Sequence, residues 1–379
     1  MKIGLVRRGY SKTGGAEAYL RRFATAMAVA GHQSVLFATK DWPAKEWPYE
    51  RQRVKHGKSP LDFALDLESM QPSNSCDFLF SLERVLACDC YRAGDGVHAV
   101  WLERRAKFEP VWKTWWRNRR DKHHELLRLE ETMFRGEAAR SVIANSQMVK
   151  DEIIRQYGYP DAKCHVVYNG APPALAPEEA AKARTEVRRE LGLDDRDYMV
   201  LFAGSGWDRK GLRYAVQAIN EAAISNPTLV VAGKGRRSGI PRSTRTRYVG
   251  PVPGLGRWLA AADAFILPTL YDPFSNACLE ALAAGLPVIT TTANGFAEII
   301  KDGIEGEIVE DPRDILALAK AIERWAPLEK RAAIRQQLRE KGARFSMEEN
   351  VRKTLEVIES VRGPWWATAD AATGAGSAK

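Results

Sequence analysis

Two adjacent basic residues stand where a charged leaving group could be held. Arg209 and Lys210 occur in the segment GSGWDRKG, directly after the apolar run 199–203. Cations fixed beside a departing diphosphate stabilise the transition state more than the ground state, so the pair predicts a pyrophosphate site. A solvated basic pair at a helix start is the alternative, but cations there oppose the helix dipole unless an anion joins them.

Two carboxylates follow in a second segment, YDPFSNACLE, which places Asp272 eight residues before Glu280. The residues between them predict a turn and then a helix start with unpaired N–H groups. Asp272 could hold sugar hydroxyls, and Glu280 could hold ribose hydroxyls. On spacing alone, an acidic residue near a helix N-terminus and a solvent-facing helical glutamate remain the alternative.

Glycines precede candidate helices at two strand ends. Gly14 and Gly15 lie between the apolar run 3–6 and a helical pattern, and Gly204 opens the basic segment. Glycine lets the backbone approach a phosphate closely, and a helix N-terminus offers free N–H groups. These positions therefore predict phosphate contacts, while a glycine pair by itself is also typical of an ordinary loop.

Strand-like and helix-like segments alternate along the chain, which predicts α/β architecture with parallel sheets covered by helices. The strand candidates are 3–6, 33–38, 78–80, 141–145 and 165–168, then 199–203, 229–232, 247–249, 264–268 and 288–292. Ligands of open parallel sheets lie beyond the carboxyl ends of the strands. Two such sheets facing each other would form a cleft walled by strand ends, with the candidate residues along it.

The chain length fits two domains, because 379 residues are too many for one ordinary core. A break is expected near residues 169–173. We predict two Rossmann-like, doubly wound domains, at 1–172 and 173–346, facing a central cleft. A C-terminal helix at 347–366 is expected to cross back to the first domain, and the tail at 367–379 is expected to be disordered.

Composition narrows the partners without choosing one. The formal net charge of +9 favours an anionic partner such as nucleic acid, a phosphorylated substrate or anionic lipid. The five cysteines include no CxxC pair, which argues against a disulfide framework or a zinc site and suits a cytosolic protein. The N-terminus does not read as a signal peptide, and no apolar stretch is long enough for a membrane span. Any membrane contact is therefore expected to be peripheral.

Two further features could suggest a metal site. Asp195 and Asp197 form a DxD pattern, but it precedes a strand instead of following one, so we interpret it as a solvated turn. His123 and His124 are adjacent and do not share a helix face. We therefore expect no metal.

Taken together, the segments GGAEAYLRRFA, GSGWDRKG and YDPFSNACLEALAAGLPVITT resemble glycosyltransferase family 4, and within it the lipopolysaccharide core glucosyltransferases. The resemblance extends over residues 1–360 and is strongest over 248–292. It implies a GT-B fold with an N-terminal acceptor domain and a C-terminal nucleotide-sugar domain. It also implies a retaining, metal-independent hexosyltransferase with no cofactor besides its co-substrate, a nucleotide sugar in which uridine is favoured as the base.

The resemblance assigns roles residue by residue. Gly15, with Gly14 and Gly204 nearby, would contact donor phosphate, and Arg209 and Lys210 would clamp the pyrophosphate. Asp272 would hold the transferred sugar and Glu280 the ribose. The backbone beside the sugar would come from Phe274, Ser275, Asn276 and Ala277.

Two departures from the family pattern affect the reacting centre. The family motif is Glu-x7-Glu, whereas this chain has Asp272 at the first position, and the shorter side chain leaves the donor sugar open. The family's acceptor-side histidine corresponds to the region 91–98, in which Asp95 and His98 are the candidates for contacts at the reacting centre. A structural role for a lone histidine remains the alternative.

The stretch 101–133 mixes tryptophans with many arginines and lysines. Tryptophan flanked by cations suits the headgroup layer of an anionic membrane. The resembling enzymes also carry a basic, membrane-associating segment in this domain. We therefore expect peripheral attachment to the cytoplasmic face of the inner membrane, with a lipopolysaccharide-core or related glycolipid as acceptor. A solvated helix with its tryptophans in the core is the alternative.

Other functions stay open at this stage. A transferase of the same family could act on another polysaccharide acceptor, and the GT-B fold also suits an epimerase or a phosphorylase. The basic and aromatic residues could bind single-stranded nucleic acid, but carboxylates in the cleft would repel a polynucleotide, so we expect no nucleic-acid partner. A peripheral membrane protein without catalysis is the last alternative. The sequence leaves the oligomeric state open.

Overall fold

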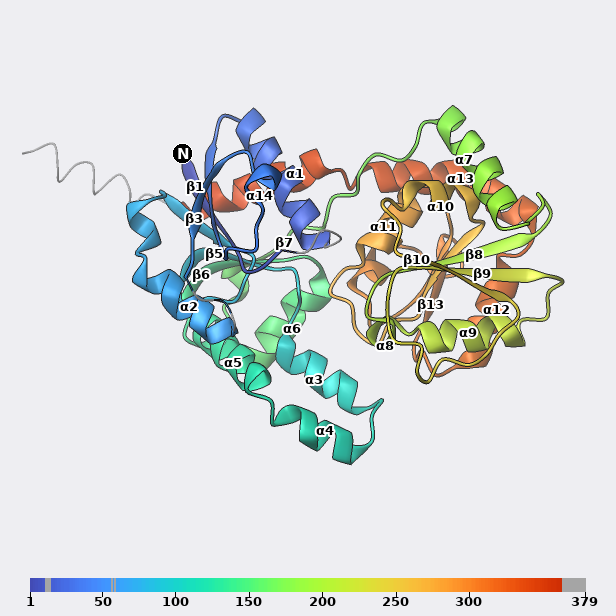
Figure 1. Cartoon of the computed structure of the whole chain (residues 1–379), viewed down its shortest axis with the longest axis horizontal. Helices are drawn as coiled ribbons and strands as arrows, with labels where there is room; N and C mark the ends of the chain where they lie inside the picture. Colours follow the sequence, from blue (N-terminus) through green and yellow to red (C-terminus); the bar gives the residue numbers. More distant parts are fainter. Residues whose placement is uncertain (11–14, 56, 58, 363–379) are drawn as a thin grey trace, which may run out of the picture.

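The chain folds into two α/β lobes, each built on a parallel sheet (Figure 1). A computed structural model describes residues 1–10, 15–55, 57 and 59–362. The order of strands is β3-β2-β1-β4-β5-β6-β7 in the first sheet and β10-β9-β8-β11-β12-β13 in the second. Both orders reverse direction beside the first strand of the sheet, which is the arrangement of doubly wound domains. The predicted pair of Rossmann-like, doubly wound domains is confirmed.

The N-terminal lobe contains every strand of the first sheet, with helices between and around them. Its strands are β1 Lys2–Arg7, β2 Gln33–Ala38, β3 Glu50–Arg53, β4 Phe78–Ser81, β5 Cys88–Ala93, β6 Ala139–Ala144 and β7 Cys164–Val166. Its helices in the described residues are α1 Gly15–Val29, α2 Pro60–Ser69, α3 His98–Ala106, α4 Val111–Asn118, α5 Asp121–Glu130, the π-helical turn η3 Glu131–Arg135, and α6 Gln147–Tyr157.

The C-terminal lobe begins after the linker helix α7 Pro177–Glu190. Its strands are β8 Tyr198–Ala203, β9 Pro227–Ala232, β10 Thr246–Gly250, β11 Ala264–Leu267, β12 Val288–Thr291 and β13 Gly306–Val309. Its helices are α8 Trp207–Lys210, α9 Leu212–Glu221, α10 Gly256–Ala261, α11 Asn276–Ala283, η5 Gly295–Ile299, α12 Ile315–Arg324 and α13 Leu328–Ala343, and the chain then continues into α14 Met347–Arg362.

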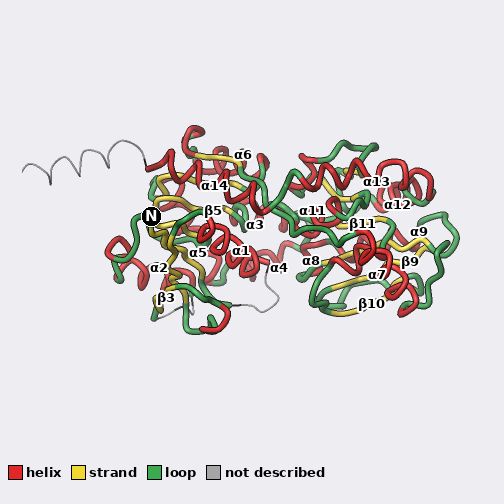
Figure 2. The backbone as a smooth tube through the Cα atoms, turned by 90° about the horizontal axis from the view of Figure 1, so that it is seen from above, coloured by secondary structure: helices red, strands yellow, loops and turns green. Residues whose placement is uncertain are grey.

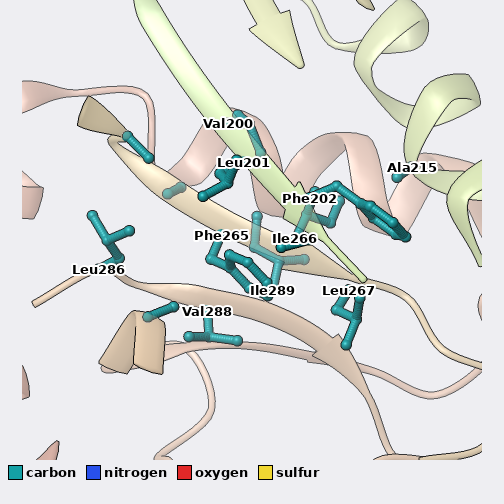
Figure 3. Packing of buried hydrophobic residues seen from close by; sticks show 14 of the residues in the cluster. Val200, Leu201, Phe202, Ala215, Phe265, Ile266, Leu267, Leu286, Val288 and Ile289 are labelled. Carbon is teal, nitrogen blue, oxygen red and sulfur yellow. The ribbon is translucent and has the colours of Figure 1, made fainter. Parts of the chain in front are cut away.

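The core of the C-terminal lobe lies on both faces of its sheet. Every residue of β8, β11 and β12 is buried, and Figure 3 shows side chains such as Phe202, Ile266 and Val288 interdigitating from neighbouring strands. Parallel strands covered by helices on both faces read as continuous apolar runs, which is why these strands could be predicted from the sequence. The rigid sheet then presents its strand ends to the site.

The last helix, α14, returns to the N-terminal lobe and packs against α1, β5 and β6. In Figure 1 it is the red helix that lies over the blue lobe, and Figure 2 shows the same pairing from above. Asn350 fastens it, because its side chain accepts a hydrogen bond from the Tyr19 hydroxyl (3.0 Å) and donates one to the Tyr168 carbonyl (2.6 Å). The chain therefore passes twice between the lobes, once before α7 and once before α14.

Ten predicted strands are present within one or two residues of the expected bounds, and β3, β5 and β13 were missed. The β3 sequence ERQR is a mostly exposed edge strand without an apolar run. The β5 sequence CDCYRA interrupts its apolar residues with charge, and β13 has only four residues. The predicted tail at 367–379 lies outside the described residues.

Across residues 1–10, 15–55, 57 and 59–362, every helix is too short or too polar to span a bilayer.

We expect Gly211→Ala to destabilise the protein far more than Gly239→Ala, a matched control. Both glycines have φ near +75°, where a side chain costs about 1–2 kcal/mol. A Cβ at Gly239 would meet open space, whereas at Gly211 it would lie 1.8 Å from the Pro268 carbonyl oxygen. Overpacking adds roughly 1–3 kcal/mol. Urea unfolding measures both, and equal losses would contradict the close approach of α8 to β11.

Candidate functional site

A cavity of about 580 Å³ lies between the two lobes at the carboxyl ends of their central strands. Arg209, Lys210, Asp272 and Glu280 all line it from the C-terminal lobe. These residues were predicted to lie along a cleft between the two sheets, and the structure brings all four together in this cavity. The described residues that line it from the N-terminal lobe include Arg7, Tyr19, Arg92, Asp95 and Asn169.

The short helix α8 fixes the two cations at the end of β8. Glycines with left-handed backbone flank it, Gly206 at φ 73° and Gly211 at φ 74°. The indole of Trp207 donates a hydrogen bond to the Gly204 carbonyl (3.1 Å), which ties the helix to the loop that precedes it. Gly204 itself lines the cavity with φ 151°, a conformation that favours glycine. Because Gly204 has no side chain, the backbone of this loop is uncovered where it lines the cavity.

Arg209 is anchored at both ends. Its guanidinium donates to the Tyr271 carbonyl (3.2 Å), and its own carbonyl accepts from the backbone N–H of Leu270 (2.9 Å). These bonds join α8 to the segment that carries Asp272. A guanidinium held in this way keeps further N–H donors for an anion.

Lys210 and Asp272 form a buried ion pair on the cavity wall. Burial would raise the pKa of the Asp272 carboxyl, but Lys210 and then Arg209 more than offset it, and the pKa lies below its usual value. Asp272 is therefore an anion in the folded protein. Its backbone is fixed too, since its N–H donates to the Ala293 carbonyl (2.9 Å).

The residues after Asp272 build a helix N-terminus facing the cavity. Ser275 caps α11, and its side chain accepts from the Cys278 N–H (3.4 Å). The Asn294 side chain accepts from the Ser275 N–H (3.2 Å) and holds the turn in place. The cavity is also lined by Phe274, Asn276 and Ala277, so all four predicted backbone contacts lie along it.

Glu280 lies one turn into α11 and is partly buried against the cavity. Burial raises the pKa of its carboxyl, and Arg22 partly opposes this rise. Among the described residues no hydrogen bond or ion pair to this carboxylate is found. Its oxygens are thus available to accept hydroxyl groups of a ligand.

A second cavity of about 470 Å³ adjoins the first on the N-terminal lobe. Asp95, Arg209 and Asp272 line both cavities, whereas His98 lines the second one. Asp95 is exposed in the loop after β5, and His98 begins α3. Of the two predicted acceptor-side residues, Asp95 therefore lies where the cavities meet and His98 lies in the second cavity.

His98 stacks on His123, with ring centroids 5.1 Å apart and a nitrogen–nitrogen distance of 2.9 Å. Burial, followed by repulsion from Arg84, lowers the pKa of His98 to about 3. The pKa of His123 is also lowered, by burial and then by Arg105 and Lys122. Both imidazoles are consequently neutral at physiological pH.

The structure gives little information on two of the predicted glycines. Gly14 lies outside the described residues, and Gly15 is the first residue of α1. Their assigned contact with donor phosphate stays a prediction.

Sequence reasoning missed the wall that the N-terminal lobe supplies. Arg7 is the last residue of β1 and forms an ion pair with Glu83 (2.8 Å). Arg92 lies near the carboxyl end of β5, and its guanidinium donates a hydrogen bond to the Asn169 side chain (2.6 Å). Asn169 in turn donates to Asn276 (2.6 Å) across the cleft. A basic residue near the end of β1 and of β5 could have indicated this wall. A single arginine at the end of a strand, however, does not by itself predict a binding site.

The DxD pattern lies away from the cavity, in the turn after α7. There the Asp197 carboxylate accepts from the backbone N–H of Asp194 (2.8 Å). Among the described residues no group of three or more His, Cys, Asp or Glu side chains is arranged to hold a metal ion. The expectation of no metal stays a prediction.

Comparison with known proteins bears on both lobes. Residues 13–175 match the model of "Glycosyltransferase Family 4", and residues 197–326 match that of "Glycosyl transferases group 1". Both lobes thus carry glycosyltransferase domains, and the chain is a glycosyltransferase. The family resemblance predicted from the sequence is thereby confirmed.

A curated relative and two solved structures are similar to this chain. An uncharacterized glycosyltransferase of Methanocaldococcus jannaschii is 32% identical over 181 residues, which cover 44% of this chain and 45% of that protein. The chain spans about half of the length of the first curated relatives that it matches.

WaaG, a glycosyltransferase involved in lipopolysaccharide biosynthesis, superposes with a TM-score of 0.75 at 18% identity, covering 94% of this chain and 99% of WaaG. HepE of Anabaena, in complex with UDP and glucose, superposes with a TM-score of 0.73 at 19% identity, covering 95% and 100%. At this identity the two structures show the fold alone, and the predicted GT-B fold is confirmed.

We expect the neutral His98 to make the protein less stable in acid. Its pKa in the folded state, about 3, lies below the ordinary 6.5, so the unfolded chain binds the proton first as pH falls through that window. Between pH 7.5 and 5 the full shift corresponds to about 2 kcal/mol, which partial exposure reduces to about 1 kcal/mol.

Chemical unfolding at both pH values measures this loss. The variant His98→Gln is the control, because glutamine does not titrate and should lose about 1 kcal/mol less than the unmodified chain. Equal losses in the two proteins would contradict the depressed pKa of His98.

Proposed function

We propose that the protein transfers a hexosyl group from a nucleotide sugar, with UDP as the nucleotide, to a hydroxyl of an acceptor, with retention of configuration and without a metal. The observation that carries the proposal is the single cavity shared by Arg209, Lys210, Asp272 and Glu280. HepE, which has the same fold, was solved with UDP and glucose, and this supports a uridine nucleotide sugar as donor.

The two cations face the place where charge would develop. In the proposed step the bond between the anomeric carbon and the β-phosphate oxygen breaks, and the acceptor oxygen bonds to that carbon on the same face. The proton of the acceptor hydroxyl passes to the departing phosphate, and UDP is the second product. Arg209 and Lys210 stabilise the growing negative charge because both are already fixed at the cavity wall.

Lys210 can serve the phosphate without leaving Asp272. Its ammonium has three donors and the Asp272 ion pair uses one of them. Asp272, held as an anion, then accepts hydroxyls of the transferred sugar, and its charge lies where an oxocarbenium-like carbon would be stabilised. The ion pair thus keeps the sugar and phosphate contacts next to each other.

The nucleoside would lie along α11. Glu280 has free acceptor oxygens for the ribose hydroxyls, and the N-terminus of α11 adds backbone N–H groups near the diphosphate. Asp95 and His98 would face the acceptor hydroxyl from the N-terminal lobe.

A glycolipid of the lipopolysaccharide-core type is the proposed acceptor, reached at the cytosolic face of the membrane. The helix α4 supports this, because Trp112, Trp115 and Trp116 are 68%, 50% and 67% exposed on it. The alternative of tryptophans packed in the core does not hold for these three. Exposed tryptophans with neighbouring cations suit the headgroup layer. WaaG, with the same fold, is a glycosyltransferase involved in lipopolysaccharide biosynthesis.

We expect Arg209→Ala to lower kcat by roughly 10²–10³-fold, equal to about 2.7–4 kcal/mol, as for loss of one transition-state donor. The measurement is UDP release from UDP-hexoses with extracted core glycolipid. Arg213→Ala is the matched control, since Arg213 is exposed on α9 outside the cavity and its loss should leave kcat unchanged. An Arg209→Ala enzyme as fast as this control would refute the assigned role.

We expect the variant Trp112→Ser/Trp116→Ser to bind vesicles containing phosphatidylglycerol roughly tenfold more weakly, because it removes apolar area from the headgroup layer. Co-sedimentation with vesicles measures the binding. The control is Leu316→Ser/Leu328→Ser, which removes exposed apolar side chains from the C-terminal lobe, 66% and 61% exposed. If both variants bound vesicles like the unmodified chain, α4 would not be the membrane contact.

A further inference from the structure

The second cavity has a basic wall that the proposed chemistry of the donor does not use. Four cations line it on the N-terminal side, and Arg209 lines it where it meets the first cavity. The carboxylates among its described lining residues are Asp95 and Asp272, both at that junction. The cations away from the junction are Arg84, Arg105, Arg120 and Lys122.

These cations differ in how far the protein neutralises them. Arg84 is buried against Glu130, and Arg105 pairs with Glu109 (3.0 Å). Arg120 and Lys122 are exposed, and no carboxylate partner for either is found among the described residues. The wall therefore carries uncompensated positive charge beside the reacting centre.

Glu130 cannot supply the missing negative charge, because its carboxylate is fully used. It accepts from the Arg84 guanidinium (2.9 Å), the backbone N–H of His98 (2.6 Å) and the Tyr157 hydroxyl (2.7 Å). Its side chain is also completely buried. The positive charge of the wall consequently faces the cavity.

We propose that the acceptor carries a phosphate group near the hydroxyl that receives the sugar, and that Arg120 and Lys122, with Arg105 beside them, bind this phosphate in the second cavity. The inference rests on the proposed function, since it treats this cavity as the acceptor side of the same site. The donor diphosphate lies on the other side of Asp95 and Asp272, so the two anions have separate cations.

The geometry suits a phosphorylated sugar or polyol. A volume of about 470 Å³ is in the range of small-molecule sites. Trp101 lines the same cavity, stacked on the Tyr271 ring (centroids 6.1 Å apart) with the Arg105 guanidinium over its indole (5.4 Å), so Arg105 is held at the cavity wall. The neutral His98–His123 pair lines the same cavity near these cations, and a neutral imidazole can donate to a phosphate or a hydroxyl without adding charge.

The test uses the full chain saturated with UDP, so that added phosphate cannot occupy the donor site. Imidazole NMR signals of His98 and His123, assigned with His98→Gln, report binding of inorganic phosphate against chloride at equal ionic strength. Phosphate is expected to shift both signals and to saturate. In Arg120→Gln/Lys122→Gln its affinity should fall roughly tenfold.

The matched control is Lys107→Gln/Lys113→Gln, which removes the same charge from exposed positions of the same segment outside the cavity. It should bind phosphate like the unmodified chain. Equal losses in both double variants, or no shift of the histidine signals with phosphate, would overturn the proposal.

A second arm separates an acceptor phosphate from a lipid headgroup. Dihexanoyl phosphatidylglycerol, kept below its micelle-forming concentration, replaces inorganic phosphate. A response to the lipid without a response to phosphate would overturn the proposal in favour of membrane contact. UDP binding, measured by calorimetry in the same samples, tests the proposed function separately: its absence would refute that function whatever the histidine signals do.

Discussion

The geometry of the cleft depends on one side chain, Tyr271, which leaves the C-terminal lobe and is buried in the core of the other. Its hydroxyl donates to Glu152 (2.8 Å) and accepts from the backbone N–H of Val97 (2.9 Å). Burial raises the pKa of this phenol far above its usual value, so the hydroxyl keeps its proton and both bonds. A Cβ at Gly96 would lie 2.3 Å from this hydroxyl, so that position needs glycine. Asp272 follows directly, and Tyr271 therefore fixes it against both lobes.

The same anchor orders the cations. The Tyr271 carbonyl accepts from Arg209, and the next residue pairs with Lys210, so the donor-side charges are held by one short stretch of chain. Preorganised charges of this kind stabilise a transition state because no reorganisation is needed when the leaving group departs. Loss of the tyrosine packing would displace Arg209, Lys210 and Asp272 together, and with them the contacts proposed for the donor.

The sequence predicted the parts of the site that are local. Arg209, Lys210, Asp272 and Glu280 each follow a buried apolar strand, and such strands are readable because both faces of a parallel sheet are covered. Arg92 escaped prediction because β5 mixes charge with apolar residues, and its contact with Asn169 joins positions 77 residues apart. The insertion of Tyr271 between Val97 and Glu152 could not be predicted either, because no local sequence pattern indicates contacts between residues 119 to 174 positions apart.

Asp95 and Asp272 have a further consequence because they lie between two groups of cations. In the proposed reaction, a nucleotide diphosphate and an anionic acceptor would repel each other across this junction. Carboxylates at the junction repel both anions, whereas Arg209, which lines both cavities, attracts them from its own side. A neutral hydroxyl pays no such electrostatic penalty at the junction. In the proposed reaction this arrangement would favour the acceptor hydroxyl over either anion beside the anomeric carbon, so the charges of the cleft would orient the two substrates as well as bind them.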